Sequence, residues 1–490
     1  MKLNPLLAID YYKATHNKML DPCVTKSVSY FIPRKSRIKD MDKAVFFGLQ
    51  GFIKEYLIES FNENFFNRSA NEVIDEYKAV MGATMGADYV DLEKIRALHQ
   101  LGYLPIEIRA LPEGASVPMG CPMFCITNTH PDFAWLPQML ESLISCEMWH
   151  PIVSATIAKE YRWIADKWYK KSWCKSDPAN AMSCFDMRGE ESLDDAIKTG
   201  AAWATSFNPC ATVGTAMYLN RYYNAPLDRT IRGSPSTEHA VMCTNTAVND
   251  GNEKEAVRKL LAMDMPMSIV LDSYDYEAMV KEVLAMDETY KRLRYGPKVL
   301  LRGDSGDPQE VVMWTVQTIK SALAKTDWLG RTTAGYITLP KNLRVIYGDS
   351  ITLKRAESIY EALINAGFSA DSVVFGAGSF SFQGIETEDG LAPLTRDTFN
   401  IAIKATYAET NQMGPTTKYK FRKEPKGADF KKSPLGCIKV TSDWYGLKWE
   451  DNLTWDEADS VDNMLIPVFR NGKMLVERSL DQIRQEVRRW

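Results

Sequence analysis

The sequence has few histidines, no clustered cysteines and no long apolar runs. Five histidines occur among its 490 residues, and the nine cysteines are odd in number and scattered. Cys121 and Cys125 are the closest cysteine pair and have no second pair beyond them, which argues against a zinc site and against a disulfide framework. No stretch approaches the roughly 18 apolar residues of a membrane-spanning helix, so none is expected.

A strong charge of either sign is also missing. The chain carries 59 basic and 63 acidic residues, for a net charge of −4. No global field therefore favours nucleic acid or an anionic membrane, and an anionic ligand must meet a local basic cluster. The segment from Met1 to Lys18 contains Asp10 and no unbroken apolar core, so we do not expect a signal peptide. We expect a cytoplasmic protein in a reducing compartment.

The composition that is present is typical of a globular protein. Hydrophobic residues make up 45% and charged residues 25% of the chain. At roughly 150 residues per domain, the length corresponds to several domains. We expect an N-terminal α+β segment at 1–150, a β/α-barrel-like catalytic domain at 151–397, and a strand-rich segment at 398–490 that packs with the N-terminal segment.

Local patterns near the two ends predict individual elements. Ser27 to Phe31 alternates in the manner of a half-buried strand, and Ala44 to Ile58 has apolar residues at helical spacing. Near the end, Leu465–Phe469 and Met474–Val476 flank Asn471-Gly472, which is a strong hairpin turn signal.

The middle of the chain repeats one pattern four times, in which a short apolar run ends in an acidic or glycine-rich loop. Helical patterns follow at least the first three of these loops. This alternation predicts an α/β fold whose parallel strands are covered by helices, as in a complete or incomplete β/α barrel. The four run-and-loop segments are Ser268–Asp275, Val299–Gly306, Arg344–Ser350 and Val373–Ser379.

In a barrel these loops open on one face, which would bring Asp272, Asp304 and Asp349 together there. Carboxylates can hold sugar hydroxyls or Mg²⁺, and the backbone amides of Gly376 to Ser379 can bind a phosphate. The set therefore suits a phosphosugar. Each aspartate taken alone fits a helix cap or a turn equally well, and the recurrence is what favours function.

Two further segments carry side chains suited to chemistry. His239 lies in a loop of small residues beside a carboxylate, where it could carry a proton, meet a phosphate or accept a phosphoryl group. A lone histidine is more often structural. Phe185 and Arg188 precede a predicted helix and could pair a flat base with an anion, although an aromatic residue followed by arginine is common by chance.

These pieces, in this order, resemble the nicotinamide phosphoribosyltransferase family, within the type II phosphoribosyltransferases that also include nicotinate phosphoribosyltransferase. The resemblance extends over nearly the whole chain. The segments that carry it are Asn4–His16, Tyr30-Phe31 with Arg34, Phe47–Gln50, Phe185 with Arg188-Gly189, Glu238-His239, Asp272–Asp275, Arg302–Gly306, Arg344–Asp349, Phe375–Ser379, Leu394–Asp397 and Phe469–Lys473.

The resemblance implies synthesis of nicotinamide mononucleotide and pyrophosphate from nicotinamide and 5-phosphoribosyl 1-pyrophosphate, with Mg²⁺ and with ATP as an optional coupled phosphoryl donor. It implies a homodimer with shared active sites. Phe185 and Tyr12 of the second subunit would enclose the base, Arg188 would lie beside base and pyrophosphate, and His239 would be phosphorylated. By the same resemblance, Arg302 would meet the phosphates, and the ribose would be held by Asp304, Gly348 and Asp349. The 5′-phosphate would be bound by Gly378, Ser379 and Arg396. Arg34 and Lys423 of the second subunit would reach the phosphates.

One departure affects the choice of base. The nicotinamide-specific enzymes carry an acidic residue in a Gly-Thr-Asp-Thr stretch, and this chain has Pro209-Cys210-Ala211-Thr212 there. A buried carboxylate would favour an amide and repel nicotinate, so transfer to nicotinate or to another pyridine is the alternative. Asp186 could substitute for the missing acid.

Two other readings remain. One is a metal-dependent phosphosugar lyase or isomerase, for which none of the four loops supplies a catalytic lysine. The other is a binding protein on a retired enzyme scaffold, which would have no physical need for the arginine, histidine and aspartate set.

Overall fold

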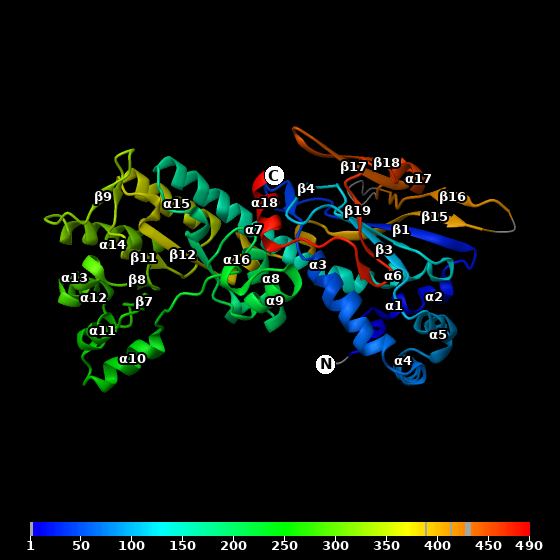
Figure 1. Ribbon diagram of the computed structural model, residues 1–490, viewed down its shortest axis with the longest axis horizontal. Helices are drawn as coiled ribbons and strands as arrows, with labels where there is room; N and C mark the ends of the chain where they lie inside the picture. The colour runs from blue at the N-terminus through cyan, green and yellow to red at the C-terminus, as the bar shows by residue number, and fades with distance from the viewer. Residues whose placement is uncertain (1–2, 388–389, 412–413, 427–432) are drawn as a thin grey trace. The chain divides into compact units, whose positions relative to one another are not determined.

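The computed structural model describes residues 3–387, 390–411, 414–426 and 433–490. The chain divides into two compact units (Figure 1). Unit 1 comprises residues 1–155, 221–225 and 394–490, and unit 2 comprises residues 156–220 and 226–393. Within the described ranges, no helix combines the length and the apolar character needed to cross a membrane.

Unit 1 is built on a sheet that draws strands from both ends of the chain. The central strand β1 (Val24–Ile32) pairs antiparallel with β15 (Ala402–Thr410) on one side and with β5 (Phe124–Asn128) on the other. The N-terminal and C-terminal segments therefore share one sheet and one core. The full strand order is β16 (Thr417–Lys420), β15, β1, β5, β3 (Ile106–Ala110), β19 (Ile466–Arg470) and β20 (Lys473–Met474).

The structure confirms two of the local predictions in this unit and corrects a third. The predicted strand at Ser27–Phe31 lies within β1, and the predicted C-terminal hairpin is β19–β20, with Asn471 and Gly472 at positive φ. The helix predicted from Ala44 is wrong at its start. Residues Lys43–Val45 form strand β2 against β4 (Ser116–Pro118), and the helix α3 begins only at Leu49.

The backbone at Gly48 prevents a continuous helix from Ala44. Gly48 has a φ of +107°, a value that favours glycine and interrupts a right-handed helix. The remaining helical elements of unit 1 and of the connection to unit 2 include α3 (Leu49–Phe52) and the π-helix Ile53–Ser60 that follows it, α4 (Ala70–Thr84), α5 (Leu92–Leu101), α7 (Glu141–Lys171), α17 (Trp455–Ala458) and α18 (Leu480–Arg489).

Unit 2 is built on a parallel sheet. Its strand order is β6 (Met182–Phe185), β12 (Val373–Gly378), β11 (Leu343–Tyr347), β8 (Val299–Gly303) and β7 (Met267–Val270). Every pairing in this sheet is parallel, and the four predicted apolar runs are its strands β7, β8, β11 and β12. Helices cover the sheet, and α14 and α15 lie beside β11 and β12 in Figure 1. The α/β fold class is confirmed.

Single parallel bridges connect the two edges of this sheet. Cys184 of β6 bridges to Cys210, Pro209 bridges to Arg232, and Ser236 bridges to Ser268 of β7. The backbone thus forms a closed ring of parallel segments, in which two of the segments are too short to count as strands. The helices of unit 2 include α8 (Leu193–Trp203), α9 (Gly214–Tyr223), α10 (His239–Val248), α11 (Glu253–Leu261), α12 (Tyr276–Ala285), α13 (Asp287–Tyr295), α14 (Pro308–Ala322), α15 (Leu353–Asn365) and α16 (Phe380–Gln383).

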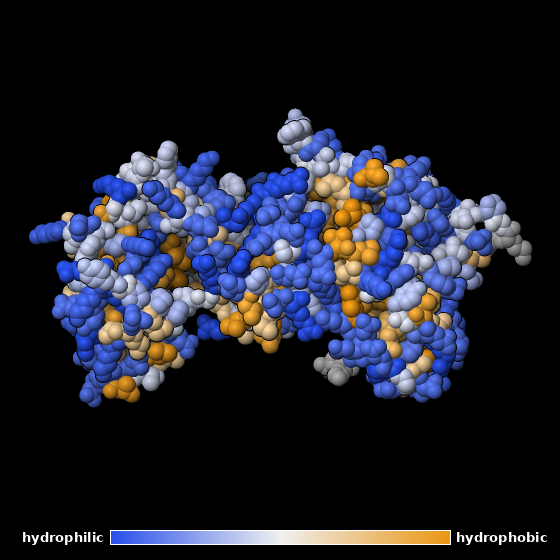
Figure 2. Space-filling view, in the orientation of Figure 1, coloured by the Kyte–Doolittle hydropathy of each residue, from blue (hydrophilic) through white to orange (hydrophobic). Residues whose placement is uncertain are grey.

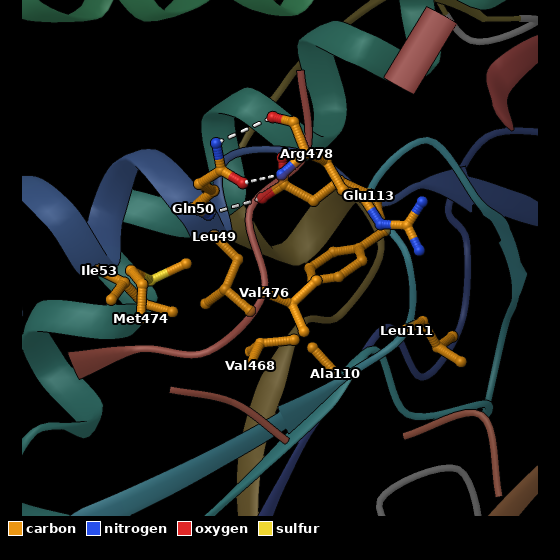
Figure 3. A pocket seen from close by; sticks show the side chains of 11 residues that line it. Leu49, Gln50, Ile53, Ala110, Leu111, Glu113, Val468, Met474, Val476 and Arg478 are labelled. Carbon is orange, nitrogen blue, oxygen red and sulfur yellow. Dashed lines mark hydrogen bonds between the residues drawn. The ribbon is translucent and has the colours of Figure 1, made fainter. Parts of the chain in front are cut away.

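A small, mainly apolar pocket in unit 1 is lined in part by the C-terminal segment (Figure 3). At its rim the Gln50 backbone N–H donates to the Glu113 carboxylate at 2.7 Å. The Gln50 side chain binds Arg478 twice, accepting from its N–H at 2.7 Å and donating to its carbonyl at 3.0 Å. Glu113 is buried, and burial raises its pKa to about 7, against hydrogen bonds from the start of α3.

Glu113 is expected to make the stability of the protein depend on pH near neutrality. The pKa of Glu113 in the folded protein lies above the ordinary value of 4.5, so the protonated carboxyl favours the folded state. This contribution to the free energy of unfolding is complete below pH 4.5 and is lost as the pH rises through about 7. We expect the wild type to lose up to about 3 kcal/mol of unfolding free energy relative to Glu113→Gln between pH 5 and 8. Calorimetry across that range checks this, and parallel curves for the two proteins would contradict it.

Candidate active site

The predicted site residues of unit 2 lie at the carboxyl ends of its parallel segments. Phe185 ends β6, Asp304 follows β8 and Gly348 follows β11. Because parallel strands point their carboxyl ends to the same edge, the loops that follow them gather there. Further residues of the set occupy equivalent places, namely Arg188 after β6, His239 after the bridged segment at Ser236, Asp272 after β7, Asp349 after β11, and Gly378 with Ser379 at the end of β12.

Asp304 and Arg302 form the central ion pair of this edge. The Arg302 guanidinium donates through Nη2 to Asp304 Oδ2 at 2.6 Å and through Nε to Oδ1 at 3.3 Å. Both side chains are largely buried, with exposed fractions of 14% for Arg302 and 21% for Asp304. A two-point pair of this kind fixes the orientation of both groups. It leaves part of each one facing the edge.

Asp272 faces inward from its loop and links two other residues of the set. Its Oδ2 accepts from the Asp304 backbone N–H at 2.8 Å and from the Ser305 hydroxyl at 2.5 Å. Its Oδ1 lies 3.6 Å from His239 Nε2. With only 4% of its side chain exposed, Asp272 holds the Asp304 loop in place and faces His239.

His239 is the first residue of α10, and half of its side chain is exposed. Its two ring nitrogens have different partners, because Nδ1 lies 3.3 Å from the Ser273 hydroxyl and Nε2 faces Asp272. A carboxylate beside one nitrogen favours a proton there, and this leaves the other nitrogen to act as an acceptor. The loop that leads to His239 is held by Thr237, whose Oγ1 accepts from the Val270 N–H at 2.9 Å.

The site is electrostatically negative around its carboxylates. Burial raises the pKa of Asp304, and Asp272 and Asp349 add to this effect, whereas Arg302 opposes it. Burial also raises the pKa of the Tyr347 hydroxyl, with Asp349 and Asp304 adding to it. Tyr347 donates to the Gly306 carbonyl at 2.9 Å. Converging carboxylates of this kind suit a cation or sugar hydroxyls.

Phe185 lies against two glycines and beside the central arginine. A Cβ on Gly376 would come within 2.3 Å of the Phe185 ring, and one on Gly348 within 3.0 Å. The Arg302 guanidinium carbon lies 5.6 Å from the ring centroid. Only glycine allows the ring to lie so close to β11 and β12, which gives this edge a flat aromatic surface.

Asp186, considered as a substitute for the missing acid, is on the buried side of the same segment. It has no exposed surface, and its Oδ1 accepts from the Thr212 hydroxyl at 3.1 Å. Ala211, which stands in the place of the acid, is exposed. Asp186 therefore connects β6 to the 209–212 segment and does not share the exposed side of Ala211.

The end of β12 is open on the side of Gly378. A Cβ on Gly378 would meet no atom within 4 Å. The neighbouring Ser379 comes so close to Gly189 that a Cβ there would lie 2.0 Å from the Ser379 Oγ. The segment after β6 and the segment after β12 are thus in direct contact, which brings the segment of Arg188 next to Gly378 and Ser379.

Three of the predicted residues, Arg34, Arg396 and Lys423, belong to a basic cluster in unit 1. Burial lowers the pKa of Arg34, and the nearby Arg396 lowers it further. Burial likewise lowers the pKa of Lys404, and so do Arg34, Lys423 and Arg396. Lys404 is a member that sequence reasoning missed, since it is one lysine within the otherwise ordinary strand β15. Tyr12, on α1 (Tyr11–Ala14), is 59% exposed.

Comparison with known proteins agrees with this arrangement. A model of the nicotinamide phosphoribosyltransferase N-terminal domain matches residues 4–108, and a model of the nicotinate phosphoribosyltransferase (NAPRTase) family matches residues 229–428. A nicotinamide phosphoribosyltransferase of Acinetobacter baylyi is 34% identical and the alignment covers 99% of this chain and 97% of that protein. The chain belongs to the nicotinamide phosphoribosyltransferase family.

Other relatives support the same family and fold. A nicotinamide phosphoribosyltransferase of Xanthomonas campestris is 29% identical over 98% of this chain and 97% of its own length. Among solved structures, human nicotinic acid phosphoribosyltransferase aligns with a TM-score of 0.59 at 15% identity, covering 98% of this chain and 92% of that one. A nicotinate-nucleotide pyrophosphorylase from Pyrococcus furiosus has a TM-score of 0.60 at 13% identity, covering 99% and 95%. At these identities the two structures establish the fold alone.

Proposed function

We propose that this member of the nicotinamide phosphoribosyltransferase family transfers the phosphoribosyl group of 5-phosphoribosyl 1-pyrophosphate to nicotinamide. The products would be nicotinamide mononucleotide and pyrophosphate, in NAD salvage. The observation that carries the proposal is the gathering of Phe185, the Arg302–Asp304 pair and His239 at one edge of unit 2. These supply a surface for a flat base, a cation for phosphate, and a carboxylate for the ribose.

The chemistry asks mainly for positioning and charge stabilisation. The pyridine nitrogen is already nucleophilic, so no general base is needed. Breaking the bond at C1 leaves cationic character on the ribose and negative charge on pyrophosphate. Arg302 and Arg188 would stabilise the leaving group, and Asp304 with Asp349 would hold the ribose hydroxyls. The Gly378-Ser379 segment and Arg396 would take the 5′-phosphate.

Magnesium fits this set as a metal shared with substrate. Among the described residues, no three His, Cys, Asp or Glu side chains cluster as a complete metal site. Mg²⁺ commonly takes one or two carboxylates together with phosphate oxygens and water. Asp304 and Asp349 are the side chains that would hold it, and the ion would neutralise charge on the pyrophosphate.

The proposal is tested by a mononucleotide-formation assay read by chromatography. Purified protein, Mg²⁺ and phosphoribosyl pyrophosphate are given nicotinamide, with and without ATP. Nicotinamide mononucleotide as a product, absent when Mg²⁺ is chelated, is the expected result. No mononucleotide from nicotinamide under either condition would overturn the assignment.

His239 is proposed as the group that couples ATP hydrolysis to transfer. His239→Ala is expected to abolish the stimulation by ATP while leaving a basal reaction, because neither the base nor the ribose needs the imidazole for binding. Initial rates with and without ATP measure this. A variant that keeps its ATP stimulation would contradict the role.

A homodimer is the proposed assembly, with Tyr12, Arg34 and Lys423 supplied by the second subunit. An exposed apolar patch over α8 and α9 supports it (Figure 2). Met187, Leu193, Val213 and Met217 there are between 50% and 79% exposed, and clustered exposed apolar side chains are typical of surfaces that bind another protein. Mixing inactive Tyr12→Ala with inactive Arg188→Ala should restore activity if sites are shared.

A reducing cytoplasm is proposed as the compartment, in keeping with nine free cysteines.

A further inference from the structure

Strand pairing in unit 2 determines which side chains share a face with Phe185. Along a strand, neighbouring side chains alternate between faces, and paired residues of parallel strands point to the same face. Cys184 pairs with Cys210, so Phe185 and Ala211 share the opposite face. Pro209 also lies on that face, and its partner across the next bridge is Arg232. Arg232 therefore points to the same face as Phe185 and Ala211.

The backbone around Arg232 is held firmly while its side chain is not. Its N–H donates to the Asn208 carbonyl at 2.8 Å, and its carbonyl accepts from the Cys210 N–H at 3.2 Å. The residue is exposed, and its guanidinium makes no hydrogen bond or ion pair with any residue in the described part of the chain. Neighbouring strands lie about 4.8 Å apart, so a long side chain two segments from β6 can reach the region of the Phe185 ring.

The 209–212 segment, which lies between β6 and Arg232, places no carboxylate on the face that carries Phe185. Ala211 presents a methyl group, and the nearby Asp186 lies on the buried face with Thr212. The other charged groups facing this region from β8 are Arg302 and Asp304, which neutralise one another. Arg232 is thus a cation without an ion-pair partner of its own on the face that carries Phe185, at an edge that also holds the carboxylates of Asp272 and Asp349.

We propose that Arg232 determines base selectivity in this chain, by donating to the ring substituent and thereby admitting a pyridine carboxylate as well as the carboxamide. The inference rests on the proposed function. A guanidinium meets a carboxylate through two charge-assisted hydrogen bonds, whereas it donates only to the oxygen of a carboxamide. With Ala211 in place of an acid, the 209–212 segment carries no charge that would repel an anionic substituent.

The test compares kcat and KM for nicotinamide and nicotinate in the wild type and in variants. The wild type should use nicotinate with a kcat/KM within about tenfold of that for nicotinamide. Arg232→Met should lower kcat/KM for nicotinate by about 50-fold, mainly through KM, and that for nicotinamide by less than about fivefold. Arg232→Lys should fall between, because it keeps the charge and loses the two-point geometry.

Two further variants separate selectivity from structure. Ala211→Asp should lower the use of nicotinate by about 100-fold and spare nicotinamide, since it places a negative charge on the same face. Arg229→Met, which removes another exposed arginine three residues earlier, should change neither substrate. Thermal unfolding of each variant shows that it remains folded.

The possible outcomes distinguish a failure of the Arg232 proposal from a failure of the proposed function on which it rests. A wild type that converts nicotinamide but uses nicotinate less than about one-thousandth as well would overturn the inference and leave the proposed function intact. Equal losses for both bases in Arg232→Met would also overturn it, because a structural residue does not discriminate. No product from either base would overturn the proposed function itself.

Discussion

Replacing Asp304 with alanine is expected to lower kcat/KM for mononucleotide formation by about 1,000-fold. The carboxylate is largely buried, its partner Arg302 holds it at 2.6 Å, and Asp272 holds its backbone N–H at 2.8 Å. Its removal takes away the proposed contact to the ribose hydroxyls and a negative charge near the sugar, whose C1 and ring oxygen become positive as the bond at C1 breaks. It also leaves the Arg302 guanidinium without its partner, free to adopt other orientations.

Initial-rate kinetics with both substrates varied measure this loss. Asp304→Asn should retain part of the activity, since an amide can still bind a hydroxyl but cannot neutralise charge. Asp287→Ala, the same change in the exposed first turn of α13, should leave the rate unchanged. Because Arg302 and Asp304 act together, Arg302→Ala with Asp304→Ala should be much less damaging than the product of the single losses. A loss below tenfold in Asp304→Ala would contradict the proposed role.

The parallel strands of unit 2 were predictable because each is short, wholly apolar and followed by a recognisable loop. That pattern is local, and it locates Asp272, Asp304 and Asp349 correctly at strand ends. It cannot give the direction in which each side chain points. Asp272 turns back toward His239 and the Asp304 N–H, and this depends on contacts between loops far apart in sequence.

Other features depend on pairings that leave no local signal. The segments Pro209-Cys210 and Arg232 join the ring through single bridges, which are too short for a period of two to be visible. Lys404 belongs to the basic cluster through Arg34, which follows β1, and Lys423, which follows β16, and the two strands are brought together only by their pairing with β15. The start of the helix predicted at Ala44 was wrong because residues Lys43–Val45 pair with the distant β4.

Gly376→Ala is expected to raise KM for nicotinamide by about 100-fold and to lower the stability by about 1–3 kcal/mol. The added Cβ would lie 2.3 Å from two carbons of the Phe185 ring, closer than any real contact, and 3.0 Å from the Gly348 Cα. The backbone of β12 is held by its neighbours β6 and β11, so the ring must move. A displaced ring no longer presents its face where the base has to be aligned with C1.

The contrast with Gly378, two residues further along β12, separates the ring clash from a general loss of glycine. A Cβ on Gly378 would meet nothing within 4 Å, so Gly378→Ala should fold as the wild type does and alter KM for phosphoribosyl pyrophosphate rather than for the base. If the clash with Phe185 is the cause, Gly376→Ala should add little further loss in a Phe185→Ala background, because the ring is already absent. Equal effects of Gly376→Ala in both backgrounds would mean that the glycine serves the backbone, and that Phe185 does not define the position of the base.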